Sequence, residues 1–237
     1  MIKEIAMKRL ISISVTTILW TEGNHAWFDV WLAPGTSIEV HWGDGHVSKH
    51  HYAKNIICRP DHYYKNLKVT ASYQIEFYSE DENAIVCLVD GTWEMHVDKL
   101  IVENCPGLKA LTYHQLYGID LSGCQNLEYL DIQDAAFDSL DFSLFPKLHK
   151  LMCKGSNFKV LDLSKNPGIE ELGYMFCHSL TKRKLPNNSN LRLANIPKYV
   201  PLDKHLRLWL QKTIERNGGR LVDWVDADYT SVGMMYK

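Results

Sequence analysis

A repeat of 21 residues runs through the middle of the chain and constrains its fold more than any other feature. The repeat occurs three times, at residues 119–130, 140–151 and 161–172. Each unit begins with Leu or Ile followed by Asp-x-Ser. Each unit ends in Leu, and the residue three positions before this Leu is Leu or Ile. This period lies in the range of leucine-rich repeats. One unit cannot bury its own apolar side, so units must stack roughly 4.8 Å apart and share a core. The repeat therefore predicts a solenoid.

The repeated region extends over residues 99–199 and is less regular at both ends. Leu108 and Leu111 match Leu127 and Leu130 at a spacing of 19 residues, two fewer than in the central units. Terminal repeats are commonly atypical, because they meet a different neighbour on one side. We therefore expect a short leucine-rich-repeat solenoid whose first and last coils are irregular.

Residues 200–237 have a different pattern, which indicates a helical C-terminal cap. Asp203 is a suitable first residue for a helix, and Gly218-Gly219 end the pattern. The side chains between them that share one helix face are Leu206, Trp209, Leu210, Thr213 and Ile214. A short strand containing Val222 and Trp224 is expected to follow. Such a helix would cover the open end of the solenoid core.

Residues 1–98 form the third expected module, an antiparallel β-sandwich. Apolar and polar residues alternate in five short runs separated by turn signals such as Pro34-Gly35 and Asp44-Gly45, and these runs cover residues 11–17, 26–32, 38–42, 67–73 and 84–89. Several short strands at this spacing are typical of a small sandwich. The fold class predicted for the whole chain is therefore mostly β.

A family resemblance supports this division. The segment 38–45 reads Ile-Glu-Val-His-Trp-Gly-Asp-Gly, and it is followed by His51-Tyr52 and by His62-Tyr63-Tyr64. The pattern resembles the Trp-x-x-Gly-Asp-Gly and His-x-Tyr motifs of polycystic-kidney-disease-type (PKD) β-sandwich domains. In gut-bacterial surface proteins, such a module is joined to 21-residue leucine-rich repeats that contain Leu-Asp-Leu-Ser. The resemblance covers roughly residues 10 to 195 and implies an exported protein at the cell surface or secreted.

Charge and hydropathy limit the partners and the location. The net charge of −2 shows no excess of basic residues, which argues against a nucleic-acid partner. Ile11, Ile13 and Val15 alternate with hydroxyl residues, which indicates a strand, and no signal-peptide cleavage site follows them. No run approaches the roughly 18 apolar residues of a membrane span. The six cysteines form no Cys-x-x-Cys pair, and we expect mostly free, structural thiols.

The stacking register separates inward from outward side chains. Leu111, Leu130, Leu151 and Leu172 are expected to stack inward, as are Tyr113, Ile132, Cys153 and Tyr174 two residues later. Alternate positions must then point outward and form one ribbon of surface. The candidate ligand-binding residues on this ribbon are Thr112, His114, Asp131, Gln133, Met152, Lys154 and Met175. Alternatively, these side chains form an ordinary solvent-exposed face of the sheet that binds no ligand.

Other polar clusters have simpler explanations. Cross-strand pairing of Asp138 with Lys159 and of Lys150 with Glu171 would neutralise much of the charge in the repeats. The Asp-x-Ser recurring in the three units could form a calcium ladder, but turn formation suffices to explain it. The histidines between residues 41 and 62 lie close to Asp44 and Asp61, yet they show no metal-ligand spacing on a helix. No metal site and no cofactor are predicted.

No catalytic motif is present: the chain lacks a Gly-x-Ser-x-Gly elbow, a His-Glu-x-x-His pair, a phosphate loop and a dinucleotide glycine motif. We therefore predict a monomeric, non-catalytic binding protein that recognises a protein ligand through the outward strand face of the solenoid. The alternative is a glycan-binding module of a bacterial surface assembly, suggested by the 26 aromatic residues (7 Trp, 12 Tyr and 7 Phe). A purely structural spacer is a third possibility.

Overall fold

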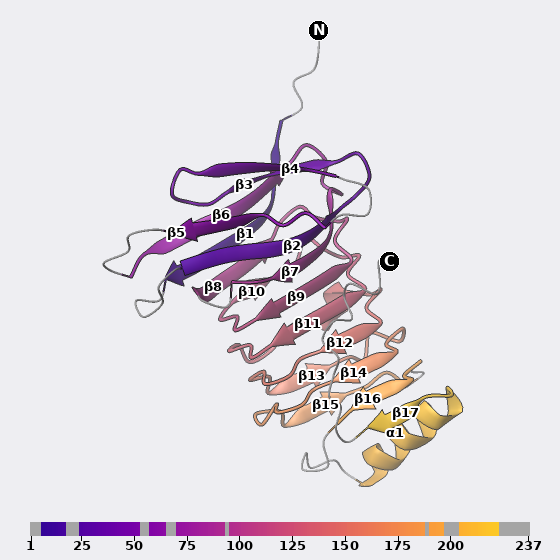
Figure 1. Cartoon of the computed structure of the whole chain (residues 1–237). Helices are drawn as coiled ribbons and strands as arrows, with labels where there is room; N and C mark the ends of the chain where they lie inside the picture. The colour runs from indigo at the N-terminus through magenta and orange to yellow at the C-terminus, as the bar shows by residue number, and fades with distance from the viewer. Residues whose placement is uncertain are drawn as a thin grey trace. The chain divides into compact units, whose positions relative to one another are not determined.

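The computed structural model describes residues 6–17, 24–52, 57–64, 70–92, 95–187, 190–196 and 204–222. It divides into two compact units, Met1–Asn126 and Leu127–Lys237. The chain is mostly β and contains a β-solenoid of about five turns, which confirms the predicted class and the predicted solenoid. Figure 1 shows the strands of both units and the helix near the C-terminus. Among the described residues, no helix is long and apolar enough to cross a membrane.

The described residues of the first unit form ten strands arranged in two sheets. One sheet has the order β10-β8-β1-β6-β3-β4, and β9, β7, β2 and β5 are neighbours in that order in the other. The strands are β1 (Lys8–Thr17), β2 (Asn24–Leu32), β3 (Ser37–His41), β4 (Val47–His51), β5 (Asp61–Tyr64), β6 (Ser72–Ser79), β7 (Ile85–Asp90), β8 (Met95–Val102), β9 (Ala110–His114) and β10 (Ile119–Asp120).

Strand pairing in this unit changes from antiparallel to parallel where the repeats begin. β1 pairs antiparallel with β6 and β8, and β2 pairs antiparallel with β5 and β7. In contrast, β9 joins β7 in parallel with Leu111 opposite Leu88, and β10 joins β8 in parallel with Ile119 opposite Leu100. The first coil thus continues the sheets of the N-terminal strands. The first compact unit accordingly ends at Asn126, beyond the boundary at residue 98 suggested by the sequence.

The hairpin at Gly43-Asp44-Gly45 forms as expected. β3 and β4 pair antiparallel on either side of it, with His41 opposite Val47. Gly43 and Gly45 have φ angles of 84° and 93°, a region that favours glycine. Asp44 Oδ1 accepts a hydrogen bond from the backbone N–H of His46 at 3.0 Å, which closes the turn.

Three strands, β4, β5 and β8, have no counterpart among the five runs predicted in residues 1–98. β4 reads Val-Ser-Lys-His-His and has few apolar residues, and β5 is only four residues long. β6 begins at Ser72, so it overlaps the expected strand at 67–73 only at its end, and residues 65–69 lie outside the described residues.

The second unit is a stack of short parallel strands. β11 (Tyr129–Gln133), β12 (Lys150–Met152), β14 (Glu171–Gly173), β16 (Leu193–Asn195) and β17 (Arg220–Val222) pair in that order, while β13 (Val160–Asp162) pairs with β15 (Lys182–Lys184). A 3-10 helix, η1, covers Phe142–Leu144.

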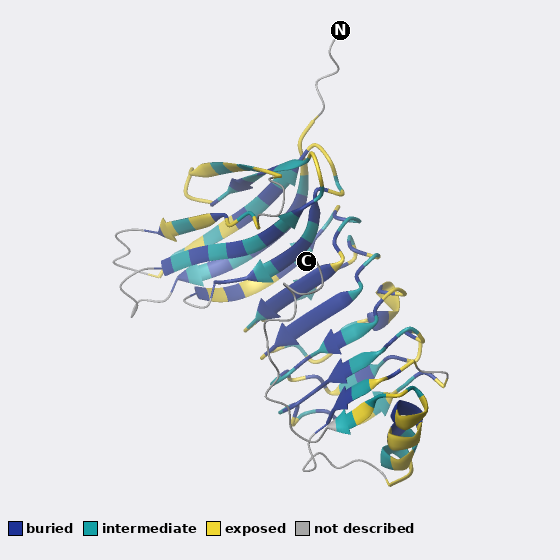
Figure 2. Cartoon of the chain, turned by 45° about the vertical axis from the view of Figure 1, so that its right-hand side comes forward, coloured by how far each residue is buried: buried dark blue, intermediate teal, exposed yellow. Residues whose placement is uncertain are grey.

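The predicted inward stack is confirmed within this unit. Leu130 lies opposite Leu151, and Leu151 lies opposite Leu172, and all three side chains are fully buried. Ile132, Cys153 and Tyr174 are buried as well. Figure 2 colours buried residues dark blue, and they recur along the stacked strands. The 21-residue spacing therefore sets which side chains face the core.

Helix α1 (Lys204–Arg216) has the predicted apolar face. Leu210, Thr213 and Ile214 are buried, and Leu206 and Trp209 are half-buried. The helix ends at the predicted glycines: Gly218 has a φ of 72°, and the N–H of Gly219 donates to the carbonyl of Ile214 at 2.9 Å. The strand expected next is β17, which pairs with β16. Asp203 and Trp224 lie outside the described residues.

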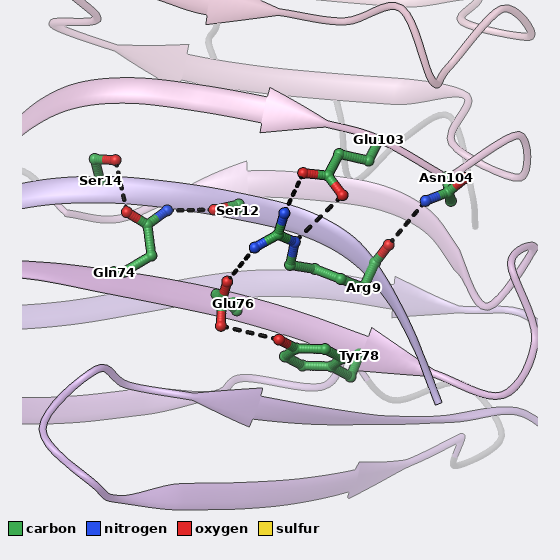
Figure 3. A network of polar contacts seen from close by, with 8 residues as sticks. All are labelled: Arg9, Ser12, Ser14, Gln74, Glu76, Tyr78, Glu103 and Asn104. Carbon is green, nitrogen blue, oxygen red and sulfur yellow. Dashed lines mark hydrogen bonds and ion pairs between the residues drawn. The ribbon is translucent and has the colours of Figure 1, made fainter. Parts of the chain in front are cut away.

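An arginine-centred network ties three strands of the first unit together (Figure 3). The guanidinium of Arg9 on β1 donates to Glu76 on β6 at 2.5 Å, and to both carboxylate oxygens of Glu103 beyond β8 at 2.5 and 3.2 Å. The hydroxyl of Tyr78 donates to the second oxygen of Glu76 at 3.0 Å. These two carboxylates raise the pKa of Arg9. The cation therefore separates two acids that would otherwise repel one another across β1.

Replacing Arg9 with methionine is expected to lower the free energy of unfolding at pH 7 by about 1 kcal/mol, a modest value because the side chain is partly exposed and screened by solvent. The loss should be smaller where Glu103 is already replaced by a neutral residue, because the repulsion between Glu76 and Glu103 is then absent. Urea unfolding at pH 7 measures both effects. In the matched control, Arg9→Met with Glu103→Gln should recover part of the loss, and no recovery would contradict this role.

Candidate functional site

The seven predicted ribbon residues are far less exposed than the sequence suggested. Thr112, Asp131, Gln133 and Met175 retain exposed fractions of only 6%, 4%, 6% and 7%. His114, Met152 and Lys154 are half-buried. The expectation that all seven side chains stand free on an outward surface is therefore wrong for four of them. On a parallel sheet, outward side chains of adjacent strands lie roughly 4.8 Å apart and shield one another, an effect that strand alternation does not reveal.

The structure places these residues in two groups. Thr112 and His114 belong to β9 in the first unit. The other five belong to the second unit, where Asp131 and Gln133 lie on β11 and Met152 lies directly opposite Asp131 on β12. Lys154 and Met175 follow the ends of β12 and β14 by two residues each. The five residues of the second unit are the candidate site on this face.

Asp131 is the electrostatically unusual member of this group. Its Oδ2 lies 3.3 Å from the Tyr129 hydroxyl and 3.3 Å from Gln133 Nε2, both of which donate to it. Its Oδ1 has no partner among the described residues. Burial raises the pKa of this carboxyl to about 6, although those hydrogen bonds and the nearby lysines favour its ionised form.

A second unsatisfied acceptor lies in the same row of the sheet. The row runs from Asp131 through Met152 and Gly173 to Asn195. Asn195 is 4% exposed, and its Oδ1 has no partner within the described part of the chain. A Cβ added at Gly173 would lie 2.4 Å from Met152 Sδ, so the thioether of Met152 occupies the space above the glycine. The row thus presents an acceptor at each end and a flexible apolar side chain between them.

Basic side chains border this row. Lys150 Nζ lies 2.9 Å from Glu171 and 5.2 Å from the centre of the Tyr129 ring. Lys154 Nζ lies 6.0 Å from the centre of the Phe176 ring. The predicted pairing of Lys150 with Glu171 is confirmed, as is that of Asp138 with Lys159 at 2.5 Å. These contacts hold the lysine stems against aromatic rings.

The Asp-x-Ser positions form turns. In each of the three units, Asp Oδ1 accepts a hydrogen bond from the backbone N–H of the serine two residues later, at 3.0 Å for Asp120, 3.0 Å for Asp141 and 3.1 Å for Asp162. Lys184 also pairs with Asp162 at 2.7 Å and holds the pKa of that carboxyl at about 2. Each carboxylate is thus engaged in its own turn, which accounts for the recurrence without calcium.

The histidine-rich hairpin forms a packed cluster in the first unit. His62 Nε2 lies 2.7 Å from Asp44 Oδ2, and the His62 ring stacks on those of Trp42 and His46 at 5.3 and 5.0 Å between ring centres. The Tyr64 hydroxyl donates to the Trp42 carbonyl at 2.7 Å. Of the two Tyr-bearing segments, the one at residues 62–64 thus contacts the tryptophan. Throughout the described residues, no group of three or more His, Cys, Asp or Glu is placed to hold a metal ion.

A ladder of cross-strand pairs on the first unit was missed by the sequence analysis. His25 on β2 pairs with Tyr63 on β5, and Trp27 pairs with Asp61. Arg59, two residues before the start of β5, donates two hydrogen bonds to Asp29, at 2.6 and 3.1 Å. We call these six residues the edge ladder. In the sequence, Ala26, Phe28 and Val30 alternate with His25, Trp27 and Asp29, and this alternation was the available signal. The structure confirms that the second set is half-buried.

The cysteines are free thiols, and all except the half-buried Cys58 are buried. Burial raises the pKa of Cys105 and of Cys124 to about 12, so both are protonated and behave as small apolar side chains.

Comparisons of the chain with protein-family models, with curated protein sequences and with solved structures found no match.

Proposed function

We propose that this protein is a non-catalytic binding protein that recognises an extended protein segment through the outward face of β11, β12, β14 and β16. The proposal includes the finer assignment of the fold: the two sheets of the first unit as a PKD-like sandwich, and the coils of the second unit as leucine-rich repeats. The 21-residue period and the Trp-Gly-Asp-Gly hairpin support that assignment.

The observation that carries the proposal is the pair of buried acceptors at the ends of one row. Asp131 Oδ1 and Asn195 Oδ1 have no partner among the described residues. A buried acceptor left without a donor costs about 1–3 kcal/mol, and more when it is charged. Buried polar groups are usually hydrogen-bonded, so a donor placed at either atom would be favourable. A ligand that supplies backbone N–H groups would satisfy both.

The spacing fits a short extended segment lying across the strands. Asp131 and Asn195 are separated by three strand-to-strand steps, or roughly 14 Å, which about four residues of extended chain would span. Met152 and Gln133 flank the carboxylate, and both have flexible side chains that can turn aside. Lys150 at the border is paired with Glu171, so the charge of this lysine is already neutralised and does not select an acidic segment.

Panning a library of random linear peptides against the protein tests the proposal. The double variant Met152→Ala/Lys154→Ala should bind the selected peptides at least tenfold more weakly, equivalent to about 1.4 kcal/mol. The matched control is Leu144→Ala/Lys147→Ala, which also removes one apolar and one lysine side chain but at exposed positions of a coil turn. Affinity for the control should be unchanged. Equal binding by the two double variants would refute the proposed face.

A further inference from the structure

We infer that the solvent-facing side of β2 and β5 in the first unit is a binding site for neutral carbohydrate, formed by the edge ladder. This inference is independent of the proposed peptide-binding face, because it rests on different residues in the other compact unit. Three features of the ladder support the inference. They are the ordered aromatic ring of Tyr63, the hydrogen-bonded pair of Arg59 and Asp29 (called the fork below), and the lack of an unpaired positive charge in the ladder.

Tyr63 supplies the first feature, an aromatic platform fixed in place. It is 52% exposed, which makes it one of the most exposed large apolar side chains of the described chain. Its ring stacks on that of His25 with 3.9 Å between the ring centres and an angle of 3° between the planes. One ring face is therefore packed against the protein, while about half of the surface of the residue stays accessible to solvent. Because the ring is already ordered, a ligand that packs on it loses little further side-chain entropy.

Arg59 and Asp29 supply the second feature. The carboxylate of Asp29 fixes the guanidinium of Arg59 through two hydrogen bonds, while the Arg59 side chain remains 62% exposed. A guanidinium has five N–H groups, so donors remain to face solvent. The guanidinium also lies 5.5 Å from the centre of the Trp27 ring. A planar donor group held in this way suits ligand hydroxyls.

Trp27 fixes the middle of the ladder. A Cβ added at Gly91 would lie 2.1 Å from atoms of the indole ring, so the ring packs directly on the backbone of the glycine. Tyr63, Asp61 and Arg59 follow one another at intervals of two residues, which gives the ladder a length of roughly 13 Å. The platform and the fork are thus far enough apart to be bridged by a short oligosaccharide.

The charges of the ladder select the class of ligand. Its one permanent cation, Arg59, is already paired with Asp29, and Asp61 adds a negative charge. Phosphate, sulfate or nucleic acid would need unpaired positive charge, which the ladder lacks. A sugar ring instead offers an apolar C–H face to Tyr63 and hydroxyls to the Arg59–Asp29 fork. Neutral carbohydrate is therefore the ligand that matches both ends of the ladder.

Affinity electrophoresis of the full chain tests this inference. Gels should contain one neutral polysaccharide each, namely soluble starch, laminarin, galactomannan or xylan, with polygalacturonate and heparin as anionic comparisons. We expect retardation by at least one neutral polysaccharide and by neither anionic one, and the retardation should persist at high salt. Tyr63→Ala should weaken this binding at least tenfold, whereas Tyr63→Trp should retain it because the stacking face remains.

Tyr117→Ala is the matched control. Tyr117 is also an exposed tyrosine, at 54%, and its ring also lies over a histidine, His96, with 5.6 Å between ring centres. Its loss should leave retardation unchanged, as should Met152→Ala/Lys154→Ala, which separates this site from the proposed peptide face. No retardation by any neutral polysaccharide, equal effects of Tyr63→Ala and Tyr117→Ala, or binding to the anionic polymers alone would each overturn the inference.

Discussion

Replacing Leu151 with alanine is expected to lower the free energy of unfolding by about 2–5 kcal/mol, through lost burial and the cavity left behind. Leu151 is fully buried and lies between Leu130 and Leu172 on the neighbouring strands. The parallel ladder fixes its neighbours at the strand spacing, so the stack has little freedom to collapse into the gap. Urea unfolding followed by far-ultraviolet circular dichroism measures the change.

Leu144→Ala removes the same atoms from an exposed position and serves as the control for Leu151→Ala. Leu144 lies in the 3-10 helix and is 38% exposed, so its loss should change stability by no more than about 0.5 kcal/mol. Similar losses for the two variants would show that Leu151 does not belong to a close-packed core.

The second large effect is expected at Asp131, whose replacement by asparagine should stabilise the protein at neutral pH by about 1–3 kcal/mol. Burial raises the pKa of this carboxyl to about 6, from about 3.9 in an unfolded chain. The folded state therefore binds the proton more tightly than the unfolded state. The contribution of Asp131 to the free energy of unfolding is therefore most favourable below about pH 4. It falls as the pH rises towards 6 and stays low above that pH. Asparagine has the same shape and no charge to bury.

Unfolding free energies at pH 4 and pH 7.5 for the wild type and Asp131→Asn measure this effect. The two proteins should differ little at pH 4, and the variant should be more stable at pH 7.5. Burial also raises the pKa of Asp90 in the first unit to about 6, but this residue is common to both proteins, so its contribution cancels in the difference. A difference that does not change with pH would contradict the buried, ionised state of Asp131.

The repeat predicted most of the second unit because its period is a direct physical signal. Core positions recurring every 21 residues can share one core only if the coils stack in register, and Leu130, Leu151 and Leu172 do so. Helix α1 was predictable for a different reason, namely the apolar residues that recur at helical spacing and end before Gly218. The first compact unit extends past residue 98 because β9 and β10, which carry the repeat in the sequence, pair with β7 and β8.

The candidate sites were predicted less well, because the direction in which a side chain points does not determine how much of it is exposed to solvent. Alternation along β11 shows that Asp131 and Gln133 face away from Leu130, but their burial depends on what lies around them. The edge ladder depends on a pairing between residues far apart in sequence, such as His25 with Tyr63, and β5 is too short to show a pattern. Long-range register of this kind is set by the whole sheet.

The Asp-x-Ser turns also determine how the length of this protein can vary. Each turn at Asp120, Asp141 and Asp162 is closed by a hydrogen bond between residues two positions apart, so its geometry does not require a particular neighbouring coil. Duplication or loss of a whole 21-residue coil would return every inward side chain to the core and change the length by roughly 4.8 Å. A one-residue change would turn the following strand over. The solenoid can therefore be lengthened or shortened by whole coils without disturbing its core.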